Sequence, residues 1–202
     1  MRSLAIGSLR GRRRGYTLVE LLAAILIIAL LAALATPSFI AMIRDRRVVR
    51  AGIFMIDTYR AARTRALSRG IAVQVRWSAD GTGRGVVQMR EAIVAAAGAG
   101  AAKGCTKADW SDGSAETREV SKYDFGGTTY ELANMKLFAT DGAESQIGNV
   151  CFAPDGQAWV RYADNGGWTK LTGVLRYDVT NTRTNFKRIV FVPPNGVARY
   201  QL

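Results

Sequence analysis

The chain of 202 residues contains no histidine, and it has only two cysteines and four prolines. Histidine is the commonest general base and metal ligand, so its absence argues against an enzyme that activates a serine or cysteine nucleophile. Cys105 and Cys151 lie far apart in the sequence and therefore form no CxxC metal or redox motif. The sequence also lacks a phosphate-binding loop, a GxSxG motif and a pair of catalytic carboxylates. We expect no catalytic residue, no cofactor and no metal.

Acidic residues are missing from the first fifteen positions, which carry five arginines: Arg2, Arg10, Arg12, Arg13 and Arg14. The whole chain has 28 Lys and Arg against 16 Asp and Glu, a net charge of +12. Outside the N-terminal stretch the basic residues do not form long tracts. This distribution is not typical of a dedicated nucleic-acid-binding protein.

A long apolar run follows the arginines. Residues Leu21 to Ala35 are all apolar, and from Tyr16 to Thr36 only Thr17 and Glu20 interrupt the pattern. A helix of this length spans roughly 30 Å, the thickness of the hydrocarbon core of a bilayer. Because these five arginines precede it, the positive-inside rule places the N-terminus in the cytoplasm and the rest of the chain on the other side.

Three interpretations of this segment compete. It is a secretory signal peptide cut near Ala33-Leu34-Ala35, an uncleaved signal anchor, or a prepilin leader cut after Gly15. Glu20 favours the third, because a carboxylate in a membrane helix costs about 2.5 to 3.5 kcal/mol near the bilayer centre and benefits neither a signal peptide nor an anchor. After cleavage Tyr16 would be the first residue, and its amino group could pair with Glu20 of a neighbouring subunit.

The stretch from Gly15 to Leu22 resembles the start of type IV pilins and pseudopilins, which have glycine, an aromatic residue, threonine, two aliphatic residues and glutamate. Tyr16 replaces the usual phenylalanine. The resemblance implies that a prepilin peptidase cleaves after Gly15 and N-methylates Tyr16. It also implies that Glu20 sets the register between subunits of a filament.

The periodicity changes after Pro37. Apolar residues recur at helical spacing on one face, at Val49, Ile53, Ile56, Tyr59, Ala62 and Ala66. The other face carries arginines: Arg44, Arg46, Arg47, Arg50, Arg60, Arg63, Arg65 and Arg69. We therefore predict one helix from Thr17 to Arg69, ended by Gly70. The arginine face either lies in solvent near anionic lipid head groups, or contacts neighbouring subunits or a polyanion such as DNA.

From Ile71 onward the pattern predicts strands. They are expected at 71–77, 86–90, 136–139, 149–152, 158–162, 173–177, 188–192 and 197–201. The stretches 150–159 and 190–199 are alike, each with a strand, a Pro/Asx/Gly turn and a second strand. This pattern is similar to the globular domain of GspH/FimT-type pseudopilins. The resemblance implies an α+β fold in which a long N-terminal helix packs against two antiparallel β-sheets.

The expected organisation has four parts: a leader (1–15), a transmembrane helix (16–37), an amphipathic continuation (38–70) and a periplasmic β-rich domain (71–202). Cys105 and Cys151 would both lie outside the cytoplasm, where disulfides persist. The sequence leaves open whether they are bonded to each other or free.

The leading hypothesis is a minor pseudopilin of a type II secretion pseudopilus or a type IV pilus, anchored in the inner membrane. Its partners would be the prepilin peptidase, other pilins or pseudopilins, and the secretion or pilus assembly platform. The alternative is a minor pilin that binds DNA for uptake. DNA-binding FimT-type members have a G-R-x-R motif, and the corresponding stretch Gly196–Arg199 lacks the first arginine. The tail is nevertheless basic through Arg183, Lys187, Arg188 and Arg199.

Overall fold

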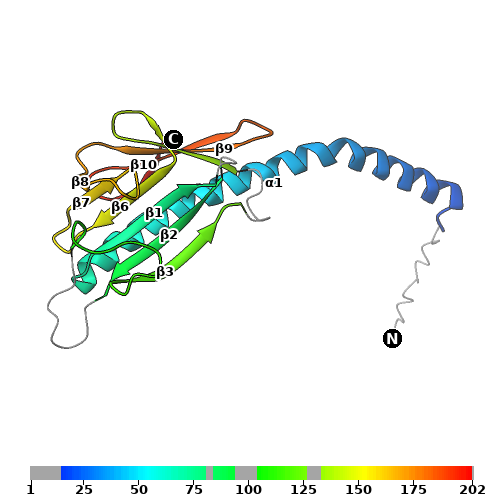
Figure 1. Ribbon diagram of the computed structural model, residues 1–202. Coiled ribbons are helices and arrows are strands. Elements are labelled where there is room, and N and C mark those ends of the chain that lie inside the picture. Colours follow the sequence, from blue (N-terminus) through cyan, green and yellow to red (C-terminus); the bar gives the residue numbers. More distant parts are fainter. Residues whose placement is uncertain (1–14, 81–83, 94–103, 127–132, 202) are drawn as a thin grey trace, which may run out of the picture. The chain divides into compact units, whose positions relative to one another are not determined.

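The structure, a computed structural model, describes residues 15–80, 84–93, 104–126 and 133–201. Residues 1–14, which make up most of the expected leader, lie outside the described part. The chain divides into two compact units, Met1–Ile40 and Ala41–Leu202, and each is described here by itself. Helix α1 (Leu18–Arg69) contributes residues to both units (Figure 1).

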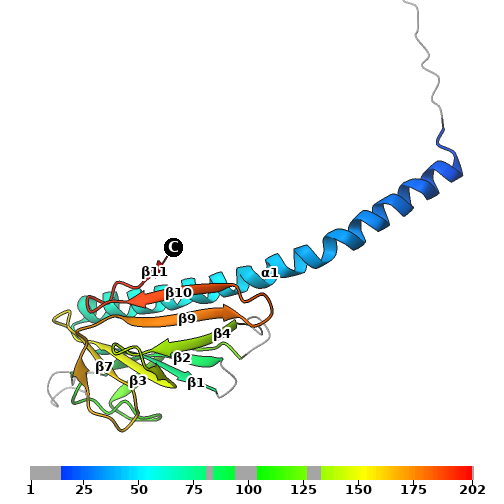
Figure 2. The same ribbon diagram turned by 90° about the horizontal axis from the view of Figure 1, so that it is seen from above.

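Eleven strands in the described residues form two sheets in the second unit (Figures 1 and 2). Sheet A has the order β3 (Thr117–Asp124), β2 (Gly85–Ala92), β1 (Val73–Ala79), β6 (Ile147–Phe152), β7 (Ala158–Arg161) and β8 (Thr169–Lys170). Sheet B has the order β11 (Arg199–Gln201), β10 (Lys187–Val192), β9 (Leu175–Asn181), β4 (Ala133–Phe138) and β5 (Glu144–Ser145). All neighbouring strands are antiparallel. The predicted α+β fold class is confirmed.

Strands β3, β5 and β8 were not predicted from the sequence. Strand β3 reads TREVSKYD, and most of its residues are exposed or half-buried because it lies at the edge of sheet A. Such a strand lacks the apolar alternation that identifies a half-buried strand. Strands β5 and β8 have two residues each and are also at sheet edges, so they are too short to leave a pattern.

The two similar stretches fold in the same way. Strands β6 and β7 form a hairpin in sheet A, and strands β10 and β11 form one in sheet B. Each turn uses a glycine with positive φ, Gly156 at 82° and Gly196 at 69°, a conformation that glycine adopts without steric cost. In the first turn the Asp155 carboxylate accepts a hydrogen bond from the Gln157 amide at 2.9 Å. The aspartate therefore serves as a turn residue.

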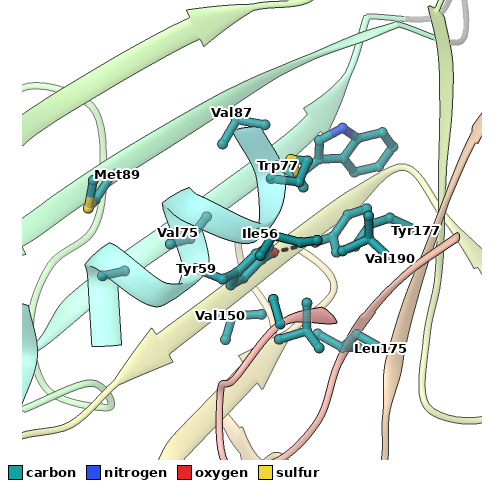
Figure 3. Packing of buried hydrophobic residues seen from close by; sticks show 14 of the residues in the cluster. Ile56, Tyr59, Val75, Trp77, Val87, Met89, Val150, Leu175, Tyr177 and Val190 are labelled. Carbon is teal, nitrogen blue, oxygen red and sulfur yellow. Dashed lines mark hydrogen bonds between the residues drawn. The ribbon is translucent and has the colours of Figure 1, made fainter. Parts of the chain in front are cut away.

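One hydrophobic core joins the second half of α1 to the inner faces of both sheets (Figure 3). Tyr59 from α1 is fully buried, and its ring packs edge-on against Phe152 from sheet A. Its hydroxyl shares a hydrogen bond of 2.5 Å with the hydroxyl of Tyr177 from sheet B. Burial raises the pKa of Tyr59 and of Tyr177 above the usual value of a tyrosine, so both phenols stay neutral. This pair ties the helix to sheet B within an otherwise apolar core.

The buried face of α1 differs from the predicted one at two positions. Val49 is only half-buried and Ile53 is 45% exposed, whereas Val48 and Met55 are fully buried. The buried stripe runs through Ala51 and Gly52, two small residues that apolar periodicity does not mark. At Gly52 an added Cβ would come within 2.4 Å of the Tyr200 hydroxyl, so the small residue lets β11 approach the helix.

A buried carboxylate links the end of α1 to sheet A. The side chain of Glu91 in β2 is only 3% exposed. It accepts a hydrogen bond from Nε of Arg65 at 2.5 Å, and it forms ion pairs with Arg69 at 3.3 Å and with Arg118 of β3. Burial alone would raise the pKa of Glu91, but Arg65 and Arg118 outweigh it, so its pKa lies below the usual value of 4.5.

We expect Glu91→Gln to lower the free energy of unfolding by about 2 to 4 kcal/mol at pH 7, because three arginines lose their buried counter-charge. Since the folded-state pKa of Glu91 is depressed, its contribution is present above pH 4.5 and is lost as the pH falls through the folded-state value. The difference between wild type and variant should shrink accordingly in acid. Unfolding of the full chain in mild detergent at several pH values measures both effects.

The matched control is Glu144→Gln, which removes an exposed ion pair with Lys136 and should change stability by less than about 1 kcal/mol. Equal effects of the two substitutions would show that the buried cluster around Glu91 has no special role in stability.

Candidate functional site

The residues around the expected cleavage point are accessible. Tyr16 is 84% exposed, and Gly15 is exposed with no atom within 4 Å of the place where a Cβ would stand. Both precede the first residue of α1, so the peptide bond between them is outside the helix. A protease that binds an extended substrate can reach this bond without unwinding the helix.

The role of Thr17 as a helix cap was not predicted from the sequence. Its hydroxyl oxygen accepts a hydrogen bond from the amide of Glu20 at 3.2 Å, which caps the start of α1. Threonine followed three residues later by glutamate is the signature of a capping box, and this spacing was available in the sequence. The cap fixes the start of the helix at Leu18, two residues after Tyr16, the expected new N-terminus.

The first turns of α1 present apolar side chains without any cover in the first unit. Exposed fractions are between 55% and 76% for the following residues: Leu18, Val19, Leu21, Leu22, Ile25, Leu26, Ile27, Ile28, Leu30, Leu31 and Leu34. One helix in the described residues is long and apolar enough to cross a membrane, and it is α1. An exposed apolar surface of this size is typical of a membrane-contact or protein-interaction site.

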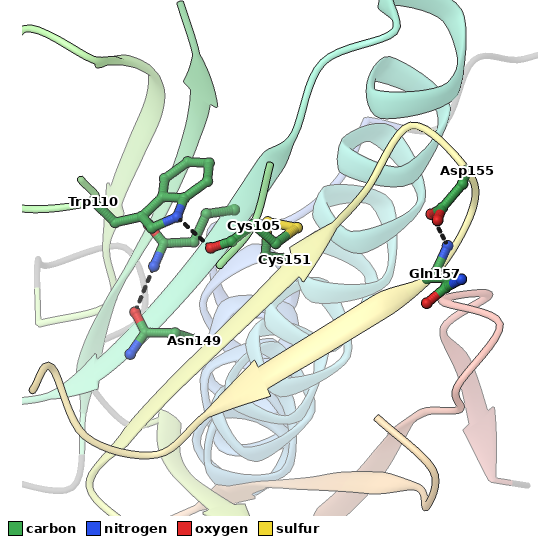
Figure 4. The surroundings of a disulfide bond; sticks show 7 residues. Cys105, Trp110, Asn149, Cys151, Asp155 and Gln157 are labelled. Carbon is green, nitrogen blue, oxygen red and sulfur yellow. Dashed lines mark hydrogen bonds between the residues drawn. A yellow bond between two sulfur atoms is a disulfide. The ribbon is translucent and has the colours of Figure 1, made fainter. Parts of the chain in front are cut away.

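The two cysteines form a disulfide with a Cα–Cα distance of 5.7 Å (Figure 4). The bond attaches the segment 104–116 to β6 on the face of sheet A that points away from the core. Trp110 in this segment is 4% exposed, and its indole Nε1 donates a hydrogen bond to the carbonyl of Cys105 at 3.0 Å. A second small cluster, containing Ala72, Ala92 and Trp110, packs around the disulfide.

The outer face of sheet A is polar but buried. The register places Gln74 opposite Cys151 and Arg76 opposite Asn149, so these side chains share one face. Gln74 and Asn149 are fully buried, and Nε2 of Gln74 donates to Oδ1 of Asn149 at 2.8 Å. Alternating polar residues normally indicate a solvent face, but here the disulfide-bonded segment covers it.

The basic residues expected to contact DNA differ in their surroundings. Arg183 in the β9–β10 turn and Arg199 in β11 are exposed. Lys187 forms an ion pair of 2.5 Å with Asp178, whose pKa is lowered because Arg176 and Lys187 outweigh its burial. Arg188 stacks on the ring of Phe186 at 4.8 Å. The four residues lie on β10, β11 and the adjoining turn.

The arginines of α1 are not all solvated. Arg65 and Arg69 bind Glu91, and Nε of Arg60 donates to the carbonyl of Ala198 at 3.1 Å. Within the described part of the chain, no group of three or more acidic, cysteine or histidine side chains is placed to bind a metal ion.

Residues 10–36 match a family model described as the prokaryotic N-terminal methylation motif. Two solved structures are similar, both of the type IV minor pilin FimU from Pseudomonas aeruginosa in different crystal forms. The first is 12% identical, covers 78% of this chain and 90% of FimU, and has a TM-score of 0.44. The second is 13% identical, with coverages of 76% and 91% and a TM-score of 0.41. No curated protein sequence matches the chain.

The motif spans the expected cleavage point, the capped start of α1 and most of its exposed apolar half. One long N-terminal helix and two antiparallel sheets complete the arrangement. The chain therefore carries the N-terminal methylation motif on a long helix whose second half packs against two antiparallel sheets.

Proposed function

We propose that the protein is a structural subunit, a minor pilin or pseudopilin, of a type IV pilus or a type II secretion pseudopilus. The observation that carries this proposal is the N-terminal methylation motif on an apolar helix whose side chains are exposed on all sides. A minor subunit would help to initiate or cap the filament and would have no active site of its own.

The proposed pathway begins in the inner membrane. The N-terminus lies in the cytoplasm, residues 16–37 cross the bilayer, and the domain from 71 to 202, preceded by the amphipathic segment 38–70, lies in the periplasm. The disulfide between Cys105 and Cys151 supports this orientation, because disulfides persist in the oxidising periplasm and not in the cytoplasm.

A prepilin peptidase then removes residues 1–15 and methylates the amino group of Tyr16. On assembly, the apolar side chains of α1 exchange lipid for the helices of neighbouring subunits. Glu20 pairs with the Tyr16 amino group of a neighbour in this low-dielectric bundle, where an unpaired charge is costly. The partners are other pilins or pseudopilins and the assembly platform.

The role of Glu20 can be tested with Glu20→Gln in a host that has a prepilin peptidase. We expect normal cleavage after Gly15 but a loss of about tenfold or more in the protein recovered from sheared, cross-linked filaments, because the side chain keeps its shape and loses its charge. Glu20→Asp keeps the charge and should assemble better than Glu20→Gln.

Thr17→Ala distinguishes an effect of the helix cap from an effect of the Glu20 charge. This variant should weaken the start of the helix without removing the charge of Glu20. Filament recovery that is the same for Glu20→Gln and wild type would contradict the proposed pairing.

A second candidate function is DNA binding for uptake. The observation that favours it is the pair of exposed arginines, Arg183 and Arg199, close in the sequence to Arg188 on β10. We expect any such binding to weaken steeply as salt rises, because phosphate contacts release counterions. The measurement is binding of the full chain in neutral detergent to a labelled duplex at 50 and 200 mM salt, with Arg183→Gln and Arg199→Gln as variants. No binding at low salt would exclude this function.

A further inference from the structure

A cavity lies on the outer face of sheet A, where the disulfide-bonded segment meets the β7–β8 turn. Its volume is about 360 Å³. The lining includes Arg76, Trp110, Asp112, Arg161, Asp164 and Asn165. The volume is within the range of small-ligand sites, and the walls are mainly polar.

Arg161 is the unusual group in this cavity. Its guanidinium lies 4.7 Å from the centre of the Trp168 ring, which holds the cation in one orientation. The side chain is half-buried, and its Nε is buried without a hydrogen-bond partner. Within the described part of the chain no salt bridge of 4 Å or less joins Arg161 to an acidic side chain, and Asp164 acts on its charge only from a longer distance.

The neighbouring cation is already neutralised. Arg76 is two strands away from Arg161 in the same row, since both are register partners of Asn149. Arg76 forms ion pairs with Asp164 at 2.7 Å and with Asp112 at 3.7 Å. Burial and the charge of Arg76 lower the pKa of Arg161, while Asp164 opposes them. A bound anion would stabilise the charged form of Arg161 against both its burial and the repulsion by Arg76.

We propose that this cavity binds a single carboxylate group, which accepts hydrogen bonds from the guanidinium of Arg161. This site does not depend on the proposed filament function, because it is formed entirely by the second unit. The planar guanidinium offers a fork that matches a carboxylate, and stacking on Trp168 keeps the fork in place before the ligand arrives.

The charge of the lining selects a carboxylate over a phosphate. Asp109, Asp112 and Asp164 also border the cavity, so a ligand with two negative charges or a nucleic-acid backbone would be repelled at its rim. A group with one charge can pair with Arg161 at a smaller cost. The carboxylate could belong to a chain terminus or to an acidic side chain.

The disulfide builds one wall of the site. Trp110 and Asp112 belong to the segment that Cys105 attaches to β6. Nη1 of Arg90 donates a hydrogen bond to the carbonyl of Trp110 at 2.7 Å. The carboxylate site should therefore exist only in the oxidised protein.

The test is a titration of the full chain in detergent micelles, followed by its intrinsic tryptophan fluorescence, because Trp110 lines the cavity and Trp168 contacts Arg161. N-acetylglycine presents a terminal carboxylate, N-acetylaspartate amide presents a side-chain carboxylate, and inorganic phosphate is the competitor. We expect saturable binding of at least one carboxylate, and the tighter of the two identifies the source. Arg161→Gln should weaken binding by about tenfold or more.

Two further variants keep the test sharp. Arg183→Gln removes an exposed arginine outside the cavity and should leave binding unchanged. Asp164→Asn removes a negative charge from the rim, frees Arg76, and should tighten binding several-fold. The proposal is overturned by the absence of saturable carboxylate binding, by equal binding in the Arg161 and Arg183 variants, or by tighter binding of phosphate than of either carboxylate.

Discussion

Replacing Gly15 with leucine is expected to keep residues 1–15 attached and to leave all of the protein at its full mass of 21.9 kDa. Glycine lets the extended backbone approach a protease closely because it has no Cβ. The substitution causes no clash within the protein itself, since no atom lies within 4 Å of the added Cβ. The wild type should instead begin at N-methyl-Tyr16. Mass spectrometry of protein from membranes of a host with a prepilin peptidase distinguishes the two.

Gly167→Leu is the matched control, because Gly167 is also exposed with open space around its Cβ and lies far from the leader in the sequence. It should be processed like the wild type. If the wild type itself begins near Thr36, the segment is a secretory signal peptide. An uncut wild type would indicate a signal anchor, and either result would remove the basis of the filament proposal.

Replacing both Cys105 and Cys151 with serine is expected to lower the free energy of unfolding by about 4 kcal/mol, the loop-entropy value for a closed loop of this length. The bond joins residues 46 positions apart, so it restricts the unfolded chain strongly. The loss should be accompanied by exposure of Trp110, which is 4% exposed when the bond holds its segment on sheet A. Denaturant unfolding and tryptophan fluorescence of the full chain in detergent measure the two effects.

Reductant provides an internal control for this prediction. Adding it to the wild type should reproduce the stability of the double variant, and adding it to the double variant should change nothing. A double variant within about 1 kcal/mol of the wild type, with Trp110 still protected, would mean that the packing of Ala72, Ala92 and Trp110 holds the segment without the bond.

Short-range patterns in the sequence predicted the apolar first half of α1, its continuation to Arg69 and eight of the strands. Apolar runs and alternation determine such elements locally, because they reflect which face of an element can be buried. The edge strand β3 was not predicted because its side chains show no apolar alternation. Its position in the sheet depends on hydrogen bonds to β2. The spacing of Thr17 and Glu20 also matches a helix cap. It was interpreted only as part of the N-terminal motif, because the two patterns overlap.

The buried face of α1 was decided by the tertiary structure. Periodicity alone places Val49 and Ile53 on the apolar stripe as readily as Val48 and Met55. The buried stripe includes Gly52, which lies against Tyr200, and the Tyr200 hydroxyl donates a hydrogen bond to the carbonyl of Val49. A contact between residues so far apart in sequence has no local signal.

The sequence by itself determined the N-terminal motif, the long apolar helix and the fold class, because each depends on residues that are close together or on a repeated pattern. Only the tertiary structure decided that the polar face of sheet A is buried and that Arg161 lies in a cavity. Alternation in β1 and β2 marks that face as solvent-exposed, but the segment that contains Cys105 and Trp110, bonded to Cys151 of β6, packs on it. The residue pattern of a strand indicates which side chains share a face. It does not indicate whether a segment distant in the sequence will cover that face.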